Sequence, residues 1–221
     1  MLISHKKKFI FIHIFKTAGT SITENFVPYA RLIDKIAHQY YPTKKAINGI
    51  NRLFGISGKG SQWATGFHKH ASALEIKKKL NAEVFDTYFK FAFVRNPYDW
   101  LVSYYYYVQE SAYHPEYKKI KGIGFEDFIP WYINQSPHTM SSFLVDEKGN
   151  TIVDYIGKLE TLNNDIINIS DKLNIPVKKI SKRNVTHKRK DKNYNEYYTP
   201  KTLKLVNDYF KKDFELLGYD M

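Results

Sequence analysis

Residues 8–21 read KFIFIHIFKTAGTS, and this stretch decides the fold. Its first half, residues 8–14, is short, apolar and rich in β-branched side chains, which is typical of a buried strand in a parallel sheet. Residues 15–20 interrupt the apolar run, and from Ser21 the apolar spacing is helical until Pro28. The stretch therefore predicts a strand, a tight loop and a helix, which is half of a βαβ unit.

The predicted loop has the chemistry of an anion site. We interpret Gly19 as the residue that lets the backbone turn tightly, and amide groups at the start of the following helix would point at a bound phosphate. Thr20 and Ser21 add hydroxyl donors, and Lys16 adds a full positive charge. Lys16 precedes the only glycine, so the loop is not a Walker A motif, and a plain strand-to-helix turn with a surface lysine is the alternative.

A second strand-to-helix junction lies in residues 91–104, FAFVRNPYDWLVSY. Residues 88–94 predict a second buried strand, and Arg95 follows it at the carboxyl end, where open α/β sheets bind ligands. Ser103 lies two helical turns further on, so both side chains can face one pocket and bind a second phosphate. The alternative is an Arg95 that pairs with Asp99.

Capping signals predict the remaining helices. Asn96 followed by Pro97 begins a helix that runs to about residue 110. Further helices are expected at 72–80 with Ser72 as N-cap, at 125–134, at 161–173, and at 200–217 between Thr199 and Gly218, whereas 30–60 reads as short helices and loops. We therefore expect one domain, residues 1–221, with an α/β, P-loop-type, three-layer fold in which helices flank a central parallel sheet.

Composition narrows the class of partner. The formal charge of +12 indicates a negatively charged partner, such as a phosphorylated cosubstrate, a nucleic acid, an anionic membrane or an acidic polysaccharide. The chain has no cysteine, which excludes disulfides, thiolate metal sites and a cysteine nucleophile. The apolar run at residues 9–14 is too short for a signal peptide or a membrane span, so we expect a cytoplasmic enzyme.

The two junctions together resemble those of the carbohydrate sulfotransferases, the family that includes the heparan sulfate 2-O-sulfotransferases and bacterial relatives. The resemblance extends from Phe9 to Tyr219, with one departure at Phe15, where the family usually has proline. It implies the sulfuryl donor PAPS (3′-phosphoadenosine 5′-phosphosulfate) as cosubstrate and no metal. It also implies a 5′-phosphosulfate site in the first junction, at Lys16, Thr17, Ala18, Gly19, Thr20 and Ser21, and a 3′-phosphate site at Arg95 and Ser103.

The same resemblance implies a histidine base before the helix that lies between the two junctions. His68 and His70 are the candidates, and in an extended segment both project to the same side. We favour His70, next to the predicted helix start, with Lys16 stabilising the leaving phosphate. A metal site made by the two histidines is the alternative, although no third ligand has a clear spacing.

A basic segment, residues 178–192, corresponds in relatives to a loop that closes over the nucleotide. Arg183 and Asn184 are our preferred pocket members there, and a solvated basic loop is the alternative. As acceptor we expect a carbohydrate or glycolipid, with a transient contact to an anionic membrane surface as a further option. Aromatic residues are candidates for a sugar groove, although core packing is the alternative for most of them: Trp63, Tyr104, Tyr105, Tyr106, Tyr107, Tyr113 and Trp131.

Two other functions compete with sulfuryl transfer. A P-loop small-molecule kinase needs magnesium ligands, but the second strand ends in Arg95 rather than in an aspartate. A nucleic-acid-binding module would suit the positive charge, but the basic residues form no known reader motif, so we expect no nucleic acid partner.

Overall fold

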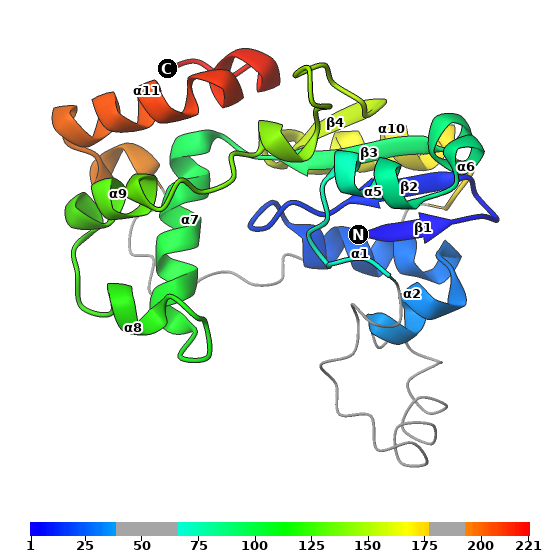
Figure 1. Ribbon diagram of the computed structural model, residues 1–221, viewed down its shortest axis with the longest axis horizontal. Coiled ribbons are helices and arrows are strands. Elements are labelled where there is room, and N and C mark those ends of the chain that lie inside the picture. Colours follow the sequence, from blue (N-terminus) through cyan, green and yellow to red (C-terminus); the bar gives the residue numbers. More distant parts are fainter. Residues whose placement is uncertain (39–65, 177–192) are drawn as a thin grey trace. The chain divides into compact units, whose positions relative to one another are not determined.

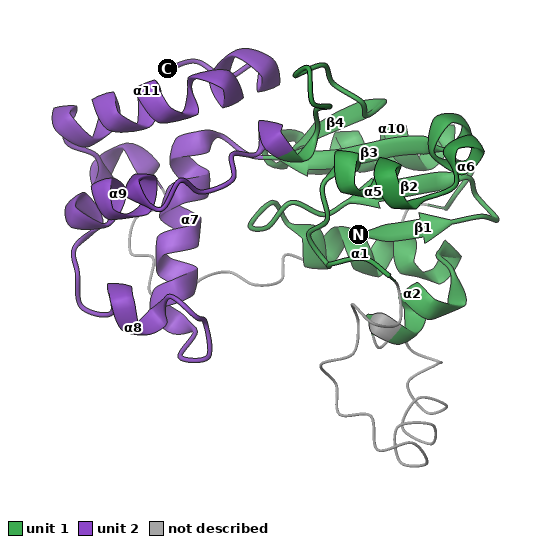
Figure 2. Cartoon of the chain, viewed as in Figure 1, with its two compact units in different colours: residues 1–94, 143–183 green, residues 95–142, 184–221 purple. Residues whose placement is uncertain are grey.

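The computed structural model describes residues 1–38, 66–176 and 193–221 (Figure 1). The chain forms two compact units, each of which combines segments that are distant in sequence (Figure 2). Unit 1 comprises residues 1–94 and 143–183, and unit 2 comprises residues 95–142 and 184–221. Each unit is described by itself.

Unit 1 is built on a four-stranded sheet in the order β1-β2-β3-β4. The strands are β1 (Leu2–Ser4), β2 (Phe9–Ile12), β3 (Phe89–Val94) and β4 (Tyr155–Lys158). Strands β2, β3 and β4 are parallel, which confirms the predicted parallel sheet, but β1 is antiparallel to β2. Strand β1 was not predicted, and its antiparallel pairing fits the tight turn that joins it to β2, since only antiparallel neighbours can be joined so briefly.

One face of the sheet carries a phenylalanine core. Phe9, Phe11, Phe91 and Phe93 alternate along β2 and β3, and all are fully buried. Helices α1 (Gly19–Phe26) and α10 (Leu162–Lys172) cover this face with apolar side chains such as Ile22, Phe26, Ile166 and Ile169. The helical spacing of those side chains in the sequence is what directs the two helices onto the sheet.

The opposite face is covered by helices α5 (Ala73–Lys79) and α6 (Ala82–Thr87), which lie in front of the strands in Figure 1. Lys90 points to this face and is buried, yet its ammonium group donates to the carbonyl oxygens of Phe85 and Tyr88 and pairs with Asp154 at 2.9 Å. Helices on both faces of a mostly parallel sheet confirm the predicted three-layer α/β architecture in this unit. The other elements of unit 1 are η1 (Val27–Tyr29), α2 (Leu32–Ala37) and η3 (Leu159–Thr161).

Strand β4 approaches β3 closely at one glycine. Gly157 is the register partner of Phe93, and a Cβ atom added to Gly157 would lie 2.6 Å from Cε1 of that ring. Glycine is therefore required there by the close approach of the phenyl ring, since Cβ contacts below 3.0 Å are not tolerated.

Unit 2 consists of helices around an aromatic core. Its elements are α7 (Pro97–Glu110), α8 (Tyr117–Ile120), α9 (Phe125–Asn134), η4 (Tyr194–Tyr197) and α11 (Pro200–Leu217), and η2 (Ser141–Phe143) leads from it back to unit 1. Trp100, Phe128, Phe210 and Phe214 are fully buried in it. Tyr104 and Tyr105 belong to this core as well, so the interpretation of these two as sugar-groove residues is wrong. Tyr107 and Tyr113 are exposed, and Trp63 lies outside the described residues.

A buried carboxylate fixes the last long helix of unit 2. Asp213 on α11 is fully buried and accepts hydrogen bonds from the backbone amides of Met140 and Ser141, at 2.9 and 2.8 Å. Burial raises the pKa of this carboxyl group, and the hydrogen bonds oppose that shift. Asp213 therefore links α11 to the segment that precedes η2.

The capping signals place most helices correctly. Ser72 forms a capping box with Glu75, Thr199 forms one with Thr202, and Gly218 ends α11 in the left-handed conformation at φ 65°. The predicted start of the first helix at Ser21 was wrong: α1 begins at Gly19 and β2 ends at Ile12, so the loop comprises residues 13–18 rather than 15–20. In the segment 30–60, the structure shows α2, and residues 39–60 lie outside the described part.

Candidate active site

The loop between β2 and α1 is shaped by two residues in the left-handed conformation, Lys16 at φ 63° and Ala18 at φ 60°. Neither is a glycine, and residues with a Cβ atom adopt this conformation at a cost of roughly 1–2 kcal/mol each. The Thr17 hydroxyl donates to the carbonyl oxygen of Ile14 at 2.9 Å and holds the loop closed. The hydroxyl of Thr17 thus makes a contact within the loop, and the backbone amide of Thr17 belongs to the same loop.

Helix α1 begins without a capping side chain, because its N-cap is Ala18. A left-handed residue followed by helical residues orients successive amide groups toward one point, which is the geometry of an anion-binding nest. The helix dipole adds a partial positive charge at the same place. Lys16 and Thr20 flank this helix start, Lys16 half-buried and Thr20 exposed.

Gly19 has a different role from the one that the sequence suggested. It adopts helical rather than left-handed backbone angles, so it does not make the tight turn. A Cβ atom added to it would lie 1.7 Å from Nε2 of His13, which means that the imidazole ring occupies the space of a side chain. Glycine is required at the start of α1 because His13 packs directly against it.

His70 lies beside this junction, and its ring is oriented by His13. The Nδ1 atom of His70 is 2.8 Å from the backbone oxygen of His13, and the two rings meet edge to face at 4.7 Å. A carbonyl oxygen can only accept, so Nδ1 carries the proton and Nε2 of the neutral ring keeps its lone pair. Burial lowers the pKa of His70 to about 4, against the opposing effect of that hydrogen bond, so the ring is neutral at pH 7.

His68 differs from His70 in both exposure and hydrogen bonding. It is exposed, and its Nδ1 atom accepts a hydrogen bond from the backbone amide of His70 at 3.2 Å. The ring centroids of the two histidines are 5.9 Å apart. His70 alone of this pair contacts the strand-to-loop junction through a hydrogen bond, and this makes it the better placed candidate base.

Phe15, the residue that departs from the family pattern, packs against the candidate base. Its ring meets His70 edge to face at 6.0 Å and Phe143 at 6.1 Å. Phe15 is half-buried and directly precedes Lys16. The loop thus places an aromatic ring next to the imidazole of His70, and a proline at this position would offer a smaller apolar surface.

Arg95 directly follows β3 and belongs to unit 2. Its guanidinium group pairs with Asp99, with Nε 2.6 Å and Nη2 2.5 Å from the same carboxylate oxygen. This is the pairing that the sequence offered as the alternative to phosphate binding, and an arginine with five donors can make both contacts. Ser103 is buried on α7, within the same unit. Arg183 and Asn184 lie outside the described residues.

The start of α7 is closed by side-chain caps. The Asn96 side chain accepts hydrogen bonds from the amides of Tyr98 and Asp99, and Pro97 has no amide hydrogen to satisfy. The helix predicted from Pro97 to about residue 110 agrees with the observed bounds of α7, Pro97–Glu110.

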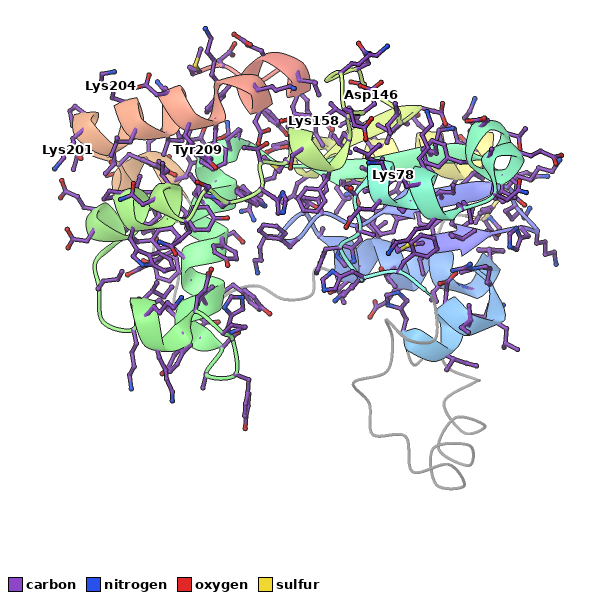
Figure 3. All side chains as sticks on the ribbon, in the orientation of Figure 1. Lys78, Asp146, Lys158, Lys201, Lys204 and Tyr209 are labelled. Atoms are coloured by element: carbon purple, nitrogen blue, oxygen red, sulfur yellow. The ribbon has the colours of Figure 1, made fainter. Side chains whose placement is uncertain are left out.

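Figure 3 labels two lysines of α11, Lys201 and Lys204. Lys204 pairs with Asp208 at 2.8 Å, and Lys211 pairs with Glu215 at 3.7 Å. These ion pairs place charges of both signs along α11.

Three or more histidine, aspartate or glutamate side chains do not gather into a potential metal site in the described part of the chain. Among the helices of those residues, none is long and apolar enough to cross a membrane.

The architecture and the strand–loop–helix junction define an α/β protein with a candidate anion site at the carboxyl ends of its parallel strands. The chain belongs to the Sulfotransferase family, whose sequence profile matches residues 1–220. The protein is thus a transferase of sulfuryl groups, and the family resemblance drawn from the sequence is confirmed. A comparison with curated proteins and a comparison with solved structures found no match.

The sequence did not reveal the role of His13. It stands inside an apolar run, immediately before Ile14, and the pattern there predicts only a buried strand. The available signal was a polar, titratable residue at the end of an otherwise apolar strand, next to the loop that was expected to bind an anion.

Proposed function

We infer that the protein transfers the sulfuryl group of PAPS to a hydroxyl group of a carbohydrate or glycoconjugate by in-line displacement. The observation that carries this proposal is the β2–α1 junction of unit 1, where a helix start without a side-chain cap, Lys16 and the neutral imidazole of His70 belong to one compact unit. Family membership supplies the reaction class, and these residues supply the parts that the reaction needs.

The phosphosulfate end of the donor would bind at the start of α1. The candidate ligands are the backbone amides and side chains of residues 16–21, namely Lys16, Thr17, Ala18, Gly19, Thr20 and Ser21. The fit is supported by the left-handed conformation at Lys16 and Ala18, which turns amide groups toward one point. Lys16 adds the charge that a developing phosphate anion requires.

His70 would act as the general base, and His68 would not. The Nε2 atom of His70 accepts the proton of the acceptor hydroxyl, whose oxygen forms the new bond to sulfur. The bond between sulfur and the bridging oxygen breaks, and the electron pair stays on the phosphate of the leaving 3′,5′-bisphosphate, next to Lys16. A bound polyanion raises the pKa of a nearby imidazole, which brings that of His70 closer to the working pH.

The 3′-phosphate of the donor would bind to Arg95 and Ser103, with Arg183 and Asn184 as further ligands. This proposal requires that the two compact units act together as one catalytic domain spanning residues 1–221. Arginine suits this role because its planar guanidinium group has five N–H donors, so some of them can bind a phosphate while others remain paired with Asp99.

The acceptor is proposed to be a carbohydrate or glycolipid, reached in the cytoplasm, with at most a transient contact to an anionic membrane. No metal ion takes part in the proposed reaction, because Lys16 and the helix start supply the positive charge. Neither the kinase nor the nucleic-acid-binding alternative receives support from the family match.

Ligand binding tests the donor before the acceptor is known. At 100 times its Kd, PAPS should raise the Tm by about 5–10 °C, since binding to the native state alone stabilises it by roughly 2.7 kcal/mol. ATP with magnesium should give a smaller shift. A larger shift with ATP and magnesium than with PAPS, or no shift with PAPS, would contradict the proposal.

A matched pair of variants tests the 3′-phosphate site. Arg95→Ala should weaken PAPS binding by about 10- to 100-fold, because it removes one charged ligand of a phosphate. Lys204→Ala removes a cation that is likewise paired with an aspartate four residues further on, and it should leave PAPS binding unchanged. Equal effects of the two variants would show that Arg95 contributes only general charge. Transfer of labelled sulfate from PAPS to a panel of polysaccharides and glycolipids then identifies the acceptor.

A further inference from the structure

His13 is the most constrained polar side chain of unit 1 that the proposed reaction does not use. It is 4% exposed, and its Nδ1 atom has no hydrogen-bond partner among the described residues. A buried polar atom in that state costs free energy, so its retention at this position calls for a role other than stability.

His13 contacts two different parts of unit 1, the start of α1 and His70. Its side chain lies against Gly19 at the start of α1, at a distance that excludes even a methyl group there. Its backbone oxygen accepts the Nδ1–H bond of His70 at 2.8 Å, and its ring touches the ring of His70. One residue thus contacts both the candidate phosphate loop and the candidate base.

We propose that His13 is a positioning residue that fixes the candidate base relative to the phosphate loop: its ring sets the place of Gly19, and its backbone oxygen sets the tautomer and orientation of His70. The inference rests on the proposed function, in which the Nε2 atom of His70 must meet a hydroxyl in line with a sulfuryl group held at the loop. In-line displacement tolerates little error in that distance, since a misplacement of about 1 Å can cost on the order of 100-fold in rate.

The surroundings of His13 keep its ring neutral and in place. Phe11 stacks on it at 5.6 Å with an interplanar angle of 19°, and His70 closes the other side. Burial lowers the pKa of His13 well below its ordinary value, and repulsion from the protonated forms of the amino terminus, His70, Lys69 and His38 acts in the same direction. The same amino terminus, Lys69 and His68 face His70, and all of them disfavour a charged base.

The decisive variants are His13→Ala, Gly19→Ala and the double variant. Each single change should lower kcat by about 10- to 100-fold with a smaller effect on the KM for PAPS, because the base and the loop lose their fixed separation. In the double variant, the methyl group introduced at position 19 can occupy space that the imidazole has left. Its Tm should therefore recover relative to Gly19→Ala, whereas kcat should not.

Two readouts separate positioning from stability. In His13→Ala, the acidic limb of the pH profile of kcat/KM should move from about 4 toward 6.5, since the ring of His70 becomes more exposed. Long-range ¹H–¹⁵N spectra should show that His70 keeps its Nδ1–H tautomer, because the backbone oxygen at position 13 is still present, and that its ring signals shift, because the neighbouring imidazole is gone. Phe9→Leu, a buried change in the strand that precedes His13, is the control, and it should lower the Tm while both readouts stay as in the parent protein.

Unchanged ring signals of His70 and an unchanged acidic limb in His13→Ala, with kcat no lower than in Phe9→Leu, would overturn the inference. Failure of the proposed function has a different signature: the parent protein would bind no PAPS and transfer no sulfate. The histidine spectra do not depend on activity, so they would still report whether His13 holds His70.

Discussion

The two strand-to-helix junctions of this chain solve the same structural problem in opposite ways. At the start of α7, the Asn96 side chain caps two backbone amides, and Arg95 pairs with Asp99. At the start of α1, the N-cap is an alanine in a left-handed conformation and no side chain caps the helix. The first arrangement stabilises a fold, whereas the second leaves a place that an anion can fill.

The difference between the two junctions shows which of them carries features that lower the stability of the fold. Left-handed Lys16 and Ala18, together with a buried imidazole that lacks one hydrogen bond, are all unfavourable features, and all occur near the β2–α1 junction. Unfavourable local structure of this kind concentrates at functional sites, where the ligand completes what the protein leaves open. The uncapped start of α1 is therefore the candidate site for an anion bound by backbone amides, whereas Asn96 already occupies those amides at the start of α7, where side chains such as Arg95 remain as candidate ligands.

The largest effect is expected at Lys16. Lys16→Ala should lower kcat by about 10²- to 10³-fold, because it removes the cation that neutralises the leaving phosphate. Steady-state kinetics with PAPS and the identified acceptor measure this. Lys8→Ala is a matched control, since Lys8 is also a left-handed lysine, at the other end of β2. A kcat for Lys16→Ala within threefold of that control would place the chemistry elsewhere.

The second prediction concerns the loss of stability at acidic pH. The pKa of folded His70 is about 4, below the ordinary 6.5, so the unfolded chain binds the proton first and the free energy of unfolding falls as the pH drops through this window. Between pH 7 and pH 5, His70 should account for a loss of about 2 kcal/mol, and His13 adds to it in the same direction. Urea unfolding at the two pH values measures the loss.

His70→Asn is the control for the acid effect. An asparagine amide can donate to the backbone oxygen of His13 much as Nδ1 does, but it does not titrate. The difference in stability between pH 7 and pH 5 should shrink in this variant. The same pH dependence in both proteins would mean that other groups cause it.

A third prediction tests the side-chain cap at the start of α7. Asn96→Ala should lower the free energy of unfolding by about 1 kcal/mol, because two amides at the start of α7 lose their cap. Asn81→Ala removes the cap of α6, which serves one amide, and it offers a comparison in unit 1. Hydrogen exchange at residues 98 and 99 should increase in Asn96→Ala only. Unchanged exchange there would show that the cap is not what closes this junction.

The smallest effect is expected at Ala18. Ala18→Gly should change the free energy of unfolding by less than about 1 kcal/mol, since relief of the left-handed conformation is offset by the greater freedom of glycine when unfolded. PAPS binding should weaken slightly, because the loop becomes less fixed. Asn174→Gly, at φ 49°, is the control, and it should gain less because asparagine already tolerates this conformation. A loss of more than about 1 kcal/mol in Ala18→Gly would contradict this view of the loop.

Much of the architecture could be predicted because local signals agreed with the final structure. The apolar strands, the caps at Ser72, Asn96 and Thr199, and the stop at Gly218 are short-range features, and each occurs as expected. Strands β1 and β4 were not predicted, because three or four residues are too few for a clear periodic pattern, and β4 in addition pairs with β3, which is distant in sequence.

The site was predictable in its residue types but not in its contacts. Lys16 and His70 were proposed from motif and position, with His70 favoured over His68, and the hydrogen bond to His13 adds a structural reason for that preference. Gly19 shows the limit most clearly. Its necessity comes from the imidazole packed against it, a tertiary contact, whereas the sequence suggested a turn.

The two glycines that accommodate a ring, Gly157 beside Phe93 and Gly19 beside His13, carry an evolutionary consequence. Neither member of such a pair can be replaced alone by a bulkier residue, because the added atoms would collide with its partner. Among relatives of this chain, positions 93 and 157 should therefore covary, and so should 13 and 19, with a side chain at the glycine position appearing only where the ring has been replaced by something smaller.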